Sequence, residues 1–264
     1  MSDQGWQQLG RFGPFFAVSV LDDHDETTRA AAGWLSLTAL VEEPDLLTGR
    51  IAAVRRALAG PAPGMAPGGL PARVAVSVTQ LGLTARLVAV ALAAAVDRLE
   101  VPGSAGLVFQ DRLGGPYPLG VLSPCGAQTL TPAGWPDALL ALVRPITQAA
   151  IDVHGLSAQV GRGNVASALA SAVRMITAVD PGAGTQARAL AGLAFATAEL
   201  HGTGSSDDAG VFRRRSCCLI YRLATDPVFC GDCVLAGRDR SSRPSSSRPA
   251  SGPSTRPSVP HSST

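Results

Sequence analysis

Lysine is absent from this sequence, and so are long apolar runs and an export signal. All 22 basic residues are arginine, which reflects a biased genome and indicates no mechanism. The longest strongly apolar run, Leu87 to Val96, has ten residues, whereas a membrane helix needs roughly 20. The first residues have neither the basic start nor the apolar run of a secretory signal. The sequence therefore predicts no transmembrane span and a cytosolic location.

Strong net charge is also lacking outside the C-terminal end of the chain. The formal net charge is +2, but residues 236–264 contain five arginines and one aspartate, which leaves the rest at −2. With a net charge so close to zero, residues 1–235 lack the basic surface typical of nucleic-acid binding. Residues 236–264 are rich in serine and proline and almost free of apolar residues, so we expect a disordered tail. Its arginines would allow contact with an acidic partner or with the inner face of the membrane.

Alternating and turn-forming residues predict a small antiparallel sheet in the first half of the chain. Residues 16–20 alternate between larger and smaller side chains, as in a strand with one packed face. Short strands are also expected at 107–110 and 117–122. Gly114 and Gly115 between them can adopt the positive φ angles of a tight hairpin turn, so we expect these two strands to pair.

Most of the remaining sequence has helical periodicity, so the predicted fold is α+β and mainly helical. A helix at 73–99 would be largely buried, either as one helix or as a pair broken near Gly82. Glycine and proline predict a loop at 60–69. Further helices are expected at 34–41, 47–58, 137–153, 165–176 and 181–200, with N-caps at Asp25, Asp137 and Asp180.

Cysteine is scarce, yet four of the five cysteines fall within 17 residues near the C-terminus. Cys217 and Cys218 are adjacent, and Cys230 and Cys233 follow after eleven intervening residues. Cys125 stands alone and is expected to be a buried residue, not a further ligand. Four thiolates suit zinc or an iron–sulfur cluster. In a cytosolic protein such a group binds metal more often than it forms disulfides.

The spacing within the two cysteine pairs bears on which metal is bound. Cys230 and Cys233 are spaced to bind one metal, with Gly231 allowing the tight turn. Neighbouring residues on an extended chain point to opposite sides, so Cys217 and Cys218 could both bind one zinc only through a contorted backbone. A two-iron cluster offers two metals and a wider perimeter, which favours iron–sulfur. Structural zinc, a disulfide framework and unligated reactive thiols remain as alternatives.

The residues around the cysteines resemble a known family. Arg214-Arg-Ser-Cys-Cys-Leu-Ile-Tyr-Arg222 and Cys230-Gly-Asp-Cys233 are similar to the C-terminal iron–sulfur segment of FhuF-type ferric siderophore reductases. The family pattern is C-C-x10-C-x2-C, and the spacer here is one residue longer. Residues 74–87, 114–116 and 163–169 also look like family segments, so the resemblance covers residues 70–235.

The resemblance implies a [2Fe-2S] cluster and a function. Its ligands would be Cys217, Cys218, Cys230 and Cys233, with the last two sharing one iron and the first two the other. The protein would be a cytosolic enzyme that passes one electron to siderophore-bound Fe(III) and releases Fe(II). Its partners would be a ferric siderophore, expected to be of hydroxamate type, and a reduced electron-donor protein or flavin, with no nucleic acid. The alternative is an iron–sulfur redox or iron-sensing protein without reductase turnover.

Three segments follow from this resemblance: a helical FhuF-like reductase domain with a minor sheet at 1–205, a cluster-binding segment at 206–235, and the tail at 236–264. Arginines beside the cysteines would favour an anionic cluster, or would form a solvated face with no tuning role. These arginines are Arg213, Arg214, Arg215 and Arg222.

Other polar residues have simpler interpretations. Asn164 and Ser167 lie on one helix face, where a cap or a tight helix contact is favoured over a substrate surface. Residues 22–25 superficially suggest a hard-metal site, but consecutive side chains diverge, and helix capping accounts for Asp25. His154 and His201 are expected near helix ends, where histidine contacts terminal carbonyls, so no catalysis is assigned to them.

Overall fold

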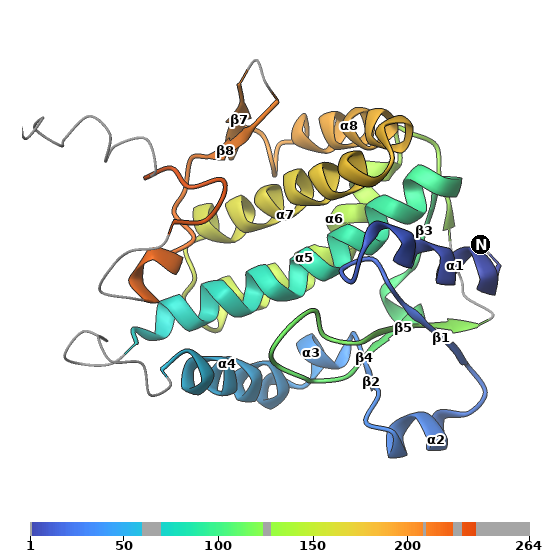
Figure 1. Cartoon of the computed structure of the whole chain (residues 1–264). Coiled ribbons are helices and arrows are strands. Elements are labelled where there is room, and N and C mark those ends of the chain that lie inside the picture. The colour runs from blue at the N-terminus through green and yellow to red at the C-terminus, as the bar shows by residue number, and fades with distance from the viewer. Residues whose placement is uncertain (1, 60–69, 124–127, 208–209, 224–228, 236–264) are drawn as a thin grey trace, which may run out of the picture.

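The computed structural model describes residues 2–59, 70–123, 128–207, 210–223 and 229–235. Three expectations fall outside these ranges: the loop at 60–69, the isolated Cys125 and the disordered tail at 236–264. In the described part of the chain the fold is α+β and mainly helical, as predicted, with a small sheet beside the helices (Figure 1).

A 27-residue helix, α5 (Ala72–Arg98), runs through the middle of the molecule (Figure 1). It is rich in alanine, valine and leucine and is buried over most of its length. The helix continues through Gly82, so the alternative of a broken pair is wrong. Four helices pack against it: α4 (Pro44–Leu58), α6 (Trp135–Asp152), α7 (Ala158–Val179) and α8 (Pro181–Phe195).

By length and composition alone, α5 could cross a membrane. However, 78% of its most apolar 18-residue window is buried inside the fold. The surrounding helices cover the side chains that lipid would otherwise contact, so α5 has the burial of a core helix.

The sheet lies to one side of the helices, with strand order β1–β5–β4–β2. The predicted hairpin is confirmed: β4 (Leu107–Phe109) and β5 (Leu119–Ser123) are antiparallel, and Gly114 has a φ of +92° in the connection. However, β1 (Ser19–Asp22) runs parallel to β5, so the sheet is mixed and not wholly antiparallel. Two-stranded pairs complete the strands: β3 (Glu100–Val101) with β6 (Gln128–Thr129), and β7 (Gly204–Ser206) with β8 (Phe212–Arg214).

The helix predicted over 34–41 is wrong. Asp25 caps a short helix, α2 (Glu26–Ala31), which ends before Gly33, where a φ of +79° turns the chain. The next residues form β2 (Leu35–Ser36) on the edge of the sheet, and only α3 (Ala39–Glu42) is helical. Pairing with β4 satisfies backbone groups that a helix would have bonded locally, and so overrides the helical spacing.

Helix boundaries also differ from prediction elsewhere: α4 begins at Pro44 and α7 at Ala158, before the predicted starts at 47 and 165. The N-cap of α6 is Gly134, so Asp137 lies in the first turn and not at the cap. Asp180 caps α8 as predicted, through a 3.0 Å hydrogen bond from Ala183 N, but α8 ends at Phe195 instead of 200. The remaining helical elements are α1 (Asp3–Gln8) and 3-10 turns at Leu9–Phe12, Ser104–Gly106 and Ile220–Leu223.

Candidate metal centre

The cysteine segment folds against one end of the helical body. In Figure 1 this segment, orange to red, lies beside the N-terminal ends of α5 and α7. The 3-10 turn at Ile220–Leu223 contacts α5, and β8 contacts α7. Helix N-termini carry a partial positive charge, so this end of the body suits an anionic group.

The four thiols are free, and two of them touch. The Sγ atoms of Cys218 and Cys230 are 3.4 Å apart, much farther than in a disulfide. The touching thiols therefore come from different halves of the motif. The sharing of one iron by Cys230 and Cys233 and of the other by Cys217 and Cys218 stays a prediction. Cys218 and Cys233 are buried, and Cys217 and Cys230 are half-buried. Among the residues that the structure describes, no three His, Cys, Asp or Glu side chains are arranged around a single metal-ion position.

The backbone is contorted immediately after the first cysteine pair. The contortion falls on the following residue, Leu219, whose φ of +69° is rare for a bulky side chain. This conformation lets Leu219 N donate a 3.3 Å hydrogen bond to Cys217 Sγ. Hydrogen bonds to sulfur help to set the reduction potential of thiolate-bound clusters, and the strained backbone at Leu219 supplies one such bond to Cys217.

The second pair forms the expected tight turn. Cys233 N donates to the carbonyl oxygen of Cys230 at 3.1 Å, and Leu235 N donates to Cys233 Sγ at 3.3 Å. Gly231 is not among the glycines with positive φ. The expectation that the turn depends on glycine in this position is therefore not supported by its backbone angle.

Contact and burial set the acidity of the thiols. The hydrogen bond shared with Cys230 lowers the pKa of Cys218 to about 6, and it raises the pKa of Cys230, because one proton lies between the two sulfurs. Burial raises the pKa of Cys217. The positive charge of Arg214 acts to lower the pKa of all three thiols. One cation thus lies within electrostatic reach of three candidate ligands.

Helix α7 provides the surface on which the cysteine segment rests. At Gly163 a Cβ atom would overlap Ser216 Oγ, so glycine permits the close approach. The next residue, Asn164, accepts a 2.6 Å hydrogen bond at Oδ1 from Arg214 Nη2. Asn164 is fully buried, which confirms the tight contact and leaves no substrate surface at this residue.

One turn farther along α7, a second contact holds the other cysteine pair. Ser167 Oγ donates to the carboxylate of Asp232, which lies between Cys230 and Cys233. The same carboxylate is 3.5 Å from Arg174 Nη1. Gly163, Asn164 and Ser167 therefore form one docking face, which we call the α7 dock.

A buried polar network extends from the α7 dock into α5. Ser77 Oγ donates to the carbonyl oxygen of Cys218 at 2.8 Å. Asn164 Nδ2 donates to Gln80 Oε1 at 2.8 Å, and Gln80 Nε2 donates to Thr147 Oγ1 at 3.0 Å. Three helices thus share one set of hydrogen bonds with the cysteine segment, which makes its position well defined.

Arg214 shows whether the site suits an anionic cluster. Its side chain is 1% exposed, and its Nε and Nη1 atoms are buried with no hydrogen-bond partner from any described residue. Among the described residues, no carboxylate lies within ion-pair distance of it. A buried cation without a counter-charge is strongly unfavourable. An anionic group at the adjacent thiols would supply that charge, so the residues present fit a four-thiolate [2Fe-2S] cluster.

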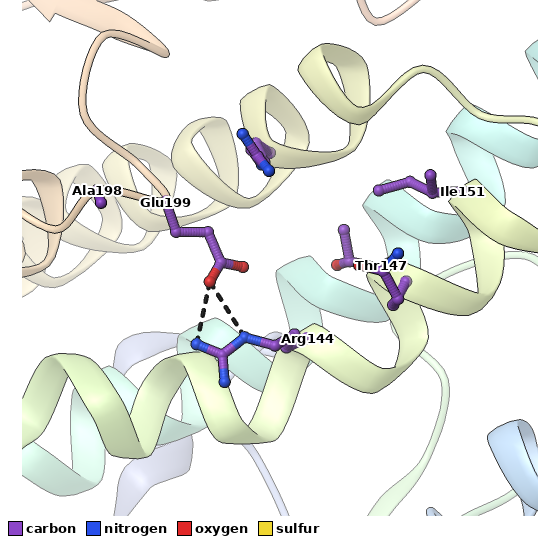
Figure 2. Close-up of a pocket in the computed structure, with 7 residues that line it drawn as sticks. Arg144, Thr147, Ile151, Ala198 and Glu199 are labelled. Carbon is purple, nitrogen blue, oxygen red and sulfur yellow. Dashed lines mark hydrogen bonds and ion pairs between the residues drawn. The ribbon is translucent and has the colours of Figure 1, made fainter.

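A pocket of about 380 Å³ lies between α6, α7 and the chain after α8. Figure 2 shows Arg144 and Glu199 facing each other across it, joined by hydrogen bonds of 3.0 and 3.1 Å. Arg162 also lines the pocket and has no ion-pair partner among the described residues. Thr147 connects this pocket to the polar network described above. The lining has one positive charge in excess, which suits an anionic ligand.

The remaining candidate residues, Asp22, Asp25, His154 and His201, have local contacts that do not involve the cysteines. Asp25 is confirmed as an N-cap through its bond from Thr28 N, and Asp22 accepts from His24 N. His154 follows the end of α6, and burial lowers its pKa. His201 lines a separate pocket beside the β7–β8 pair.

Sequence reasoning missed three members of the site, Asp232, Ser77 and Gln80, and did not separate Arg214 from its neighbours. The alternation of buried and exposed side chains along β8 is the sequence signal that could have identified Arg214 as buried. Phe212 and Arg214 are buried while Arg213 is exposed, as period-2 alternation beside a buried aromatic predicts. No sequence pattern marks the polar residues of α5, which are assembled by tertiary packing.

Comparison with known proteins agrees with this geometry. Residues 214–235 match the family described as the FhuF 2Fe-2S C-terminal domain. This stretch begins at the buried arginine and includes all four clustered cysteines, so the longer spacer does not prevent the match. No curated protein and no solved structure matches the chain. Residues 214–235 of the chain are therefore similar to the FhuF 2Fe-2S C-terminal domain, which indicates a [2Fe-2S] cluster as the cofactor.

Proposed function

We propose that this protein is a cytosolic ferric siderophore reductase whose cluster is bound by Cys217, Cys218, Cys230 and Cys233. The observation that carries the proposal is the match at residues 214–235 together with four free thiols beside a buried arginine that has no ion-pair partner among the described residues. Residues 1–205 would form the helical body and 206–235 the cluster-binding segment. When bound, a four-thiolate [2Fe-2S] cluster stores one electron at a potential of roughly −400 mV.

The chemistry of the substrate explains the need for such a reductant. Hydroxamate and related oxygen ligands are hard and anionic, and they bind Fe(III) much more tightly than Fe(II). Each tenfold increase in the ratio of Fe(III) affinity to Fe(II) affinity lowers the one-electron reduction potential of the chelate by about 59 mV. A strongly reducing donor is therefore required, and adding one electron to the chelated Fe(III) loosens the metal.

The exposed surface around the cysteines would allow electrons to enter and leave. Cys217 and Cys230 are half-buried, so part of the site reaches the surface. Arg213, Arg215 and Arg222 are exposed around it and would attract an acidic donor protein, a reduced flavin or an anionic chelate.

Single-turnover reduction tests the proposed function. We expect anaerobically purified protein to be reddish-brown and to bleach with dithionite. Mixing the reduced protein with a ferric trihydroxamate should restore the absorbance and yield one Fe(II) per cluster, trapped by a ferrous chelator. The Ga(III) complex of the same ligand is the control, because Ga(III) resembles Fe(III) in size and charge but accepts no electron. A reduced cluster that no ferric chelate reoxidises would leave the iron-sensing alternative.

The arginine-lined pocket is the place where we expect an anionic part of the chelate to bind. Replacing the unpaired Arg162 by glutamine should raise KM for a carboxylate-bearing ferric chelate by about fivefold, as expected for one partly solvated charge-assisted contact. The kcat should stay unchanged, because Arg162 lies outside the cysteine segment. Arg56→Gln, an exposed arginine on α4, is the matched control. An equal change in both variants would show that only overall charge matters.

A further inference from the structure

Arg214 is a buried arginine whose hydrogen-bonding capacity is only partly used. Its Nη2 donates to Asn164 Oδ1 at 2.6 Å and to Ser216 Oγ at 3.4 Å. Both acceptors are neutral. Nε and Nη1 are buried and have no hydrogen-bond partner in the part of the chain that the structure describes. A guanidinium always carries its positive charge, so this charge is enclosed in the protein without a visible counter-ion among the described residues.

The nearby carboxylate does not serve as that counter-ion. Asp232 receives the backbone N–H of Arg214 at its carbonyl oxygen, 3.1 Å away. Its side chain is bonded instead to Ser167 and lies 3.5 Å from Arg174. The cysteine segment surrounds Arg214 on both sides: its backbone N–H is bonded inside the Cys230–Cys233 turn, and its guanidinium contacts Ser216, the residue before Cys217.

We infer that Arg214 is the internal counter-ion of the cluster, a positioning residue that supplies positive charge and free N–H donors and raises the reduction potential. The inference rests on the proposed cluster site but is independent of the substrate. A four-thiolate [2Fe-2S] cluster carries about two negative charges when oxidised and about three when reduced. A nearby cation therefore stabilises the reduced form more.

Burial distinguishes Arg214 from the other arginines of the segment. Arg213, Arg215 and Arg222 are exposed, and exposed charges are strongly screened by water and salt. Arg214 is enclosed, and Asn164 fixes its guanidinium to α7. The sequence contains three consecutive arginines, but only the middle one is placed to act on the cluster in a low-dielectric environment.

The test is a redox titration of the full-length holoprotein followed by the electron paramagnetic resonance signal of the reduced cluster. In Arg214→Gln the equilibrium constant for reduction should fall at least tenfold, a potential lower by about 59 mV. Arg213→Gln removes the same charge from the same strand but from an exposed position, and should change the constant less than twofold, about 18 mV. Arg214→Lys keeps the charge but loses the planar fork, and should fall between them, near threefold or about 28 mV.

Circular dichroism and iron content per chain keep the result interpretable. A folded Arg214→Gln chain that lacks the cluster, while Arg213→Gln and Arg214→Lys retain it, supports the inference, because the charge is then needed for binding. If Arg214→Gln does not fold, the reduction potential of Arg214→Lys becomes the test. An unshifted potential in Arg214→Lys overturns the inference. A fully loaded Arg214→Gln with an unshifted potential also overturns it.

The outcome is separable from that of the proposed function. If the potential depends on Arg214 but no ferric chelate reoxidises the cluster, the reductase proposal fails and this inference stands. If ferric chelates are reduced and the potential of Arg214→Gln is unshifted, this inference fails alone.

Discussion

Serine at position 218 or 230 is expected to leave the purified protein almost colourless. The Sγ atoms of Cys218 and Cys230 are 3.4 Å apart and link the two halves of the motif, and serine is a much poorer ligand for iron than thiolate. Loss of an outer-shell partner already costs roughly 10- to 100-fold in metal affinity. Loss of a direct ligand should therefore reduce cluster content below about a tenth of the wild-type value.

Iron, sulfide and visible absorbance per chain measure this effect. Cys125→Ser is the control, since Cys125 stands 92 positions before Cys217 in the chain. It should bind a full cluster. Equal cluster content in Cys218→Ser and Cys125→Ser would remove Cys218 from the ligand set. Zinc in place of iron in the wild-type protein would contradict the cofactor itself.

Valine at position 163 should detach the cysteine segment from α7 without breaking the helix. A Cβ on Gly163 would overlap Ser216 Oγ and lie 3.1 Å from Arg214 Nη2, and both neighbours are buried. Overpacking of this kind costs about 3 kcal/mol at the upper end of its usual range. That cost would lower the ratio of docked to undocked segment by more than about 100-fold, and cluster content should fall with it.

A matched variant and a double variant isolate the steric cause. Gly82 lies in the middle of α5, and a Cβ at this position would have nothing within 4 Å of it, so Gly82→Val should keep the cluster. Gly163→Ala should lose part of it, and adding Ser216→Ala should restore much of that loss, since the overlapping Oγ is removed. Full cluster content in Gly163→Val would show that the segment does not rest on the α7 dock.

Several parts of the fold could be predicted because they depend on local chemistry. The composition of 73–99 predicts a buried helix, since alanine, valine and leucine dominate it, and α5 has this burial. Two glycines between apolar strands predict the β4–β5 hairpin. Asp180 followed by proline predicts the start of α8. Each of these three predictions depends only on residues that are close together in the sequence.

Other parts were mispredicted because contacts distant in sequence override local preference. Residues 34–41 have helical spacing, yet Leu35 pairs with Phe109 across the sheet. Residues 16–20 alternate as a strand should, but the strand begins at Ser19 and joins β5 in parallel.

The sequence by itself determined the chemistry of the site, because four cysteines in this spacing are a local pattern that needs no fold to be read. It also determined which segment carries them, residues 214–235. Only the tertiary structure decided how that segment is held. Asn164 and Ser167 lie about 50 and 65 positions before their partners Arg214 and Asp232, and no local periodicity links residues so far apart. The fold also singled out Arg214 among three consecutive arginines, because burial is a property of the packed chain and not of the residue type.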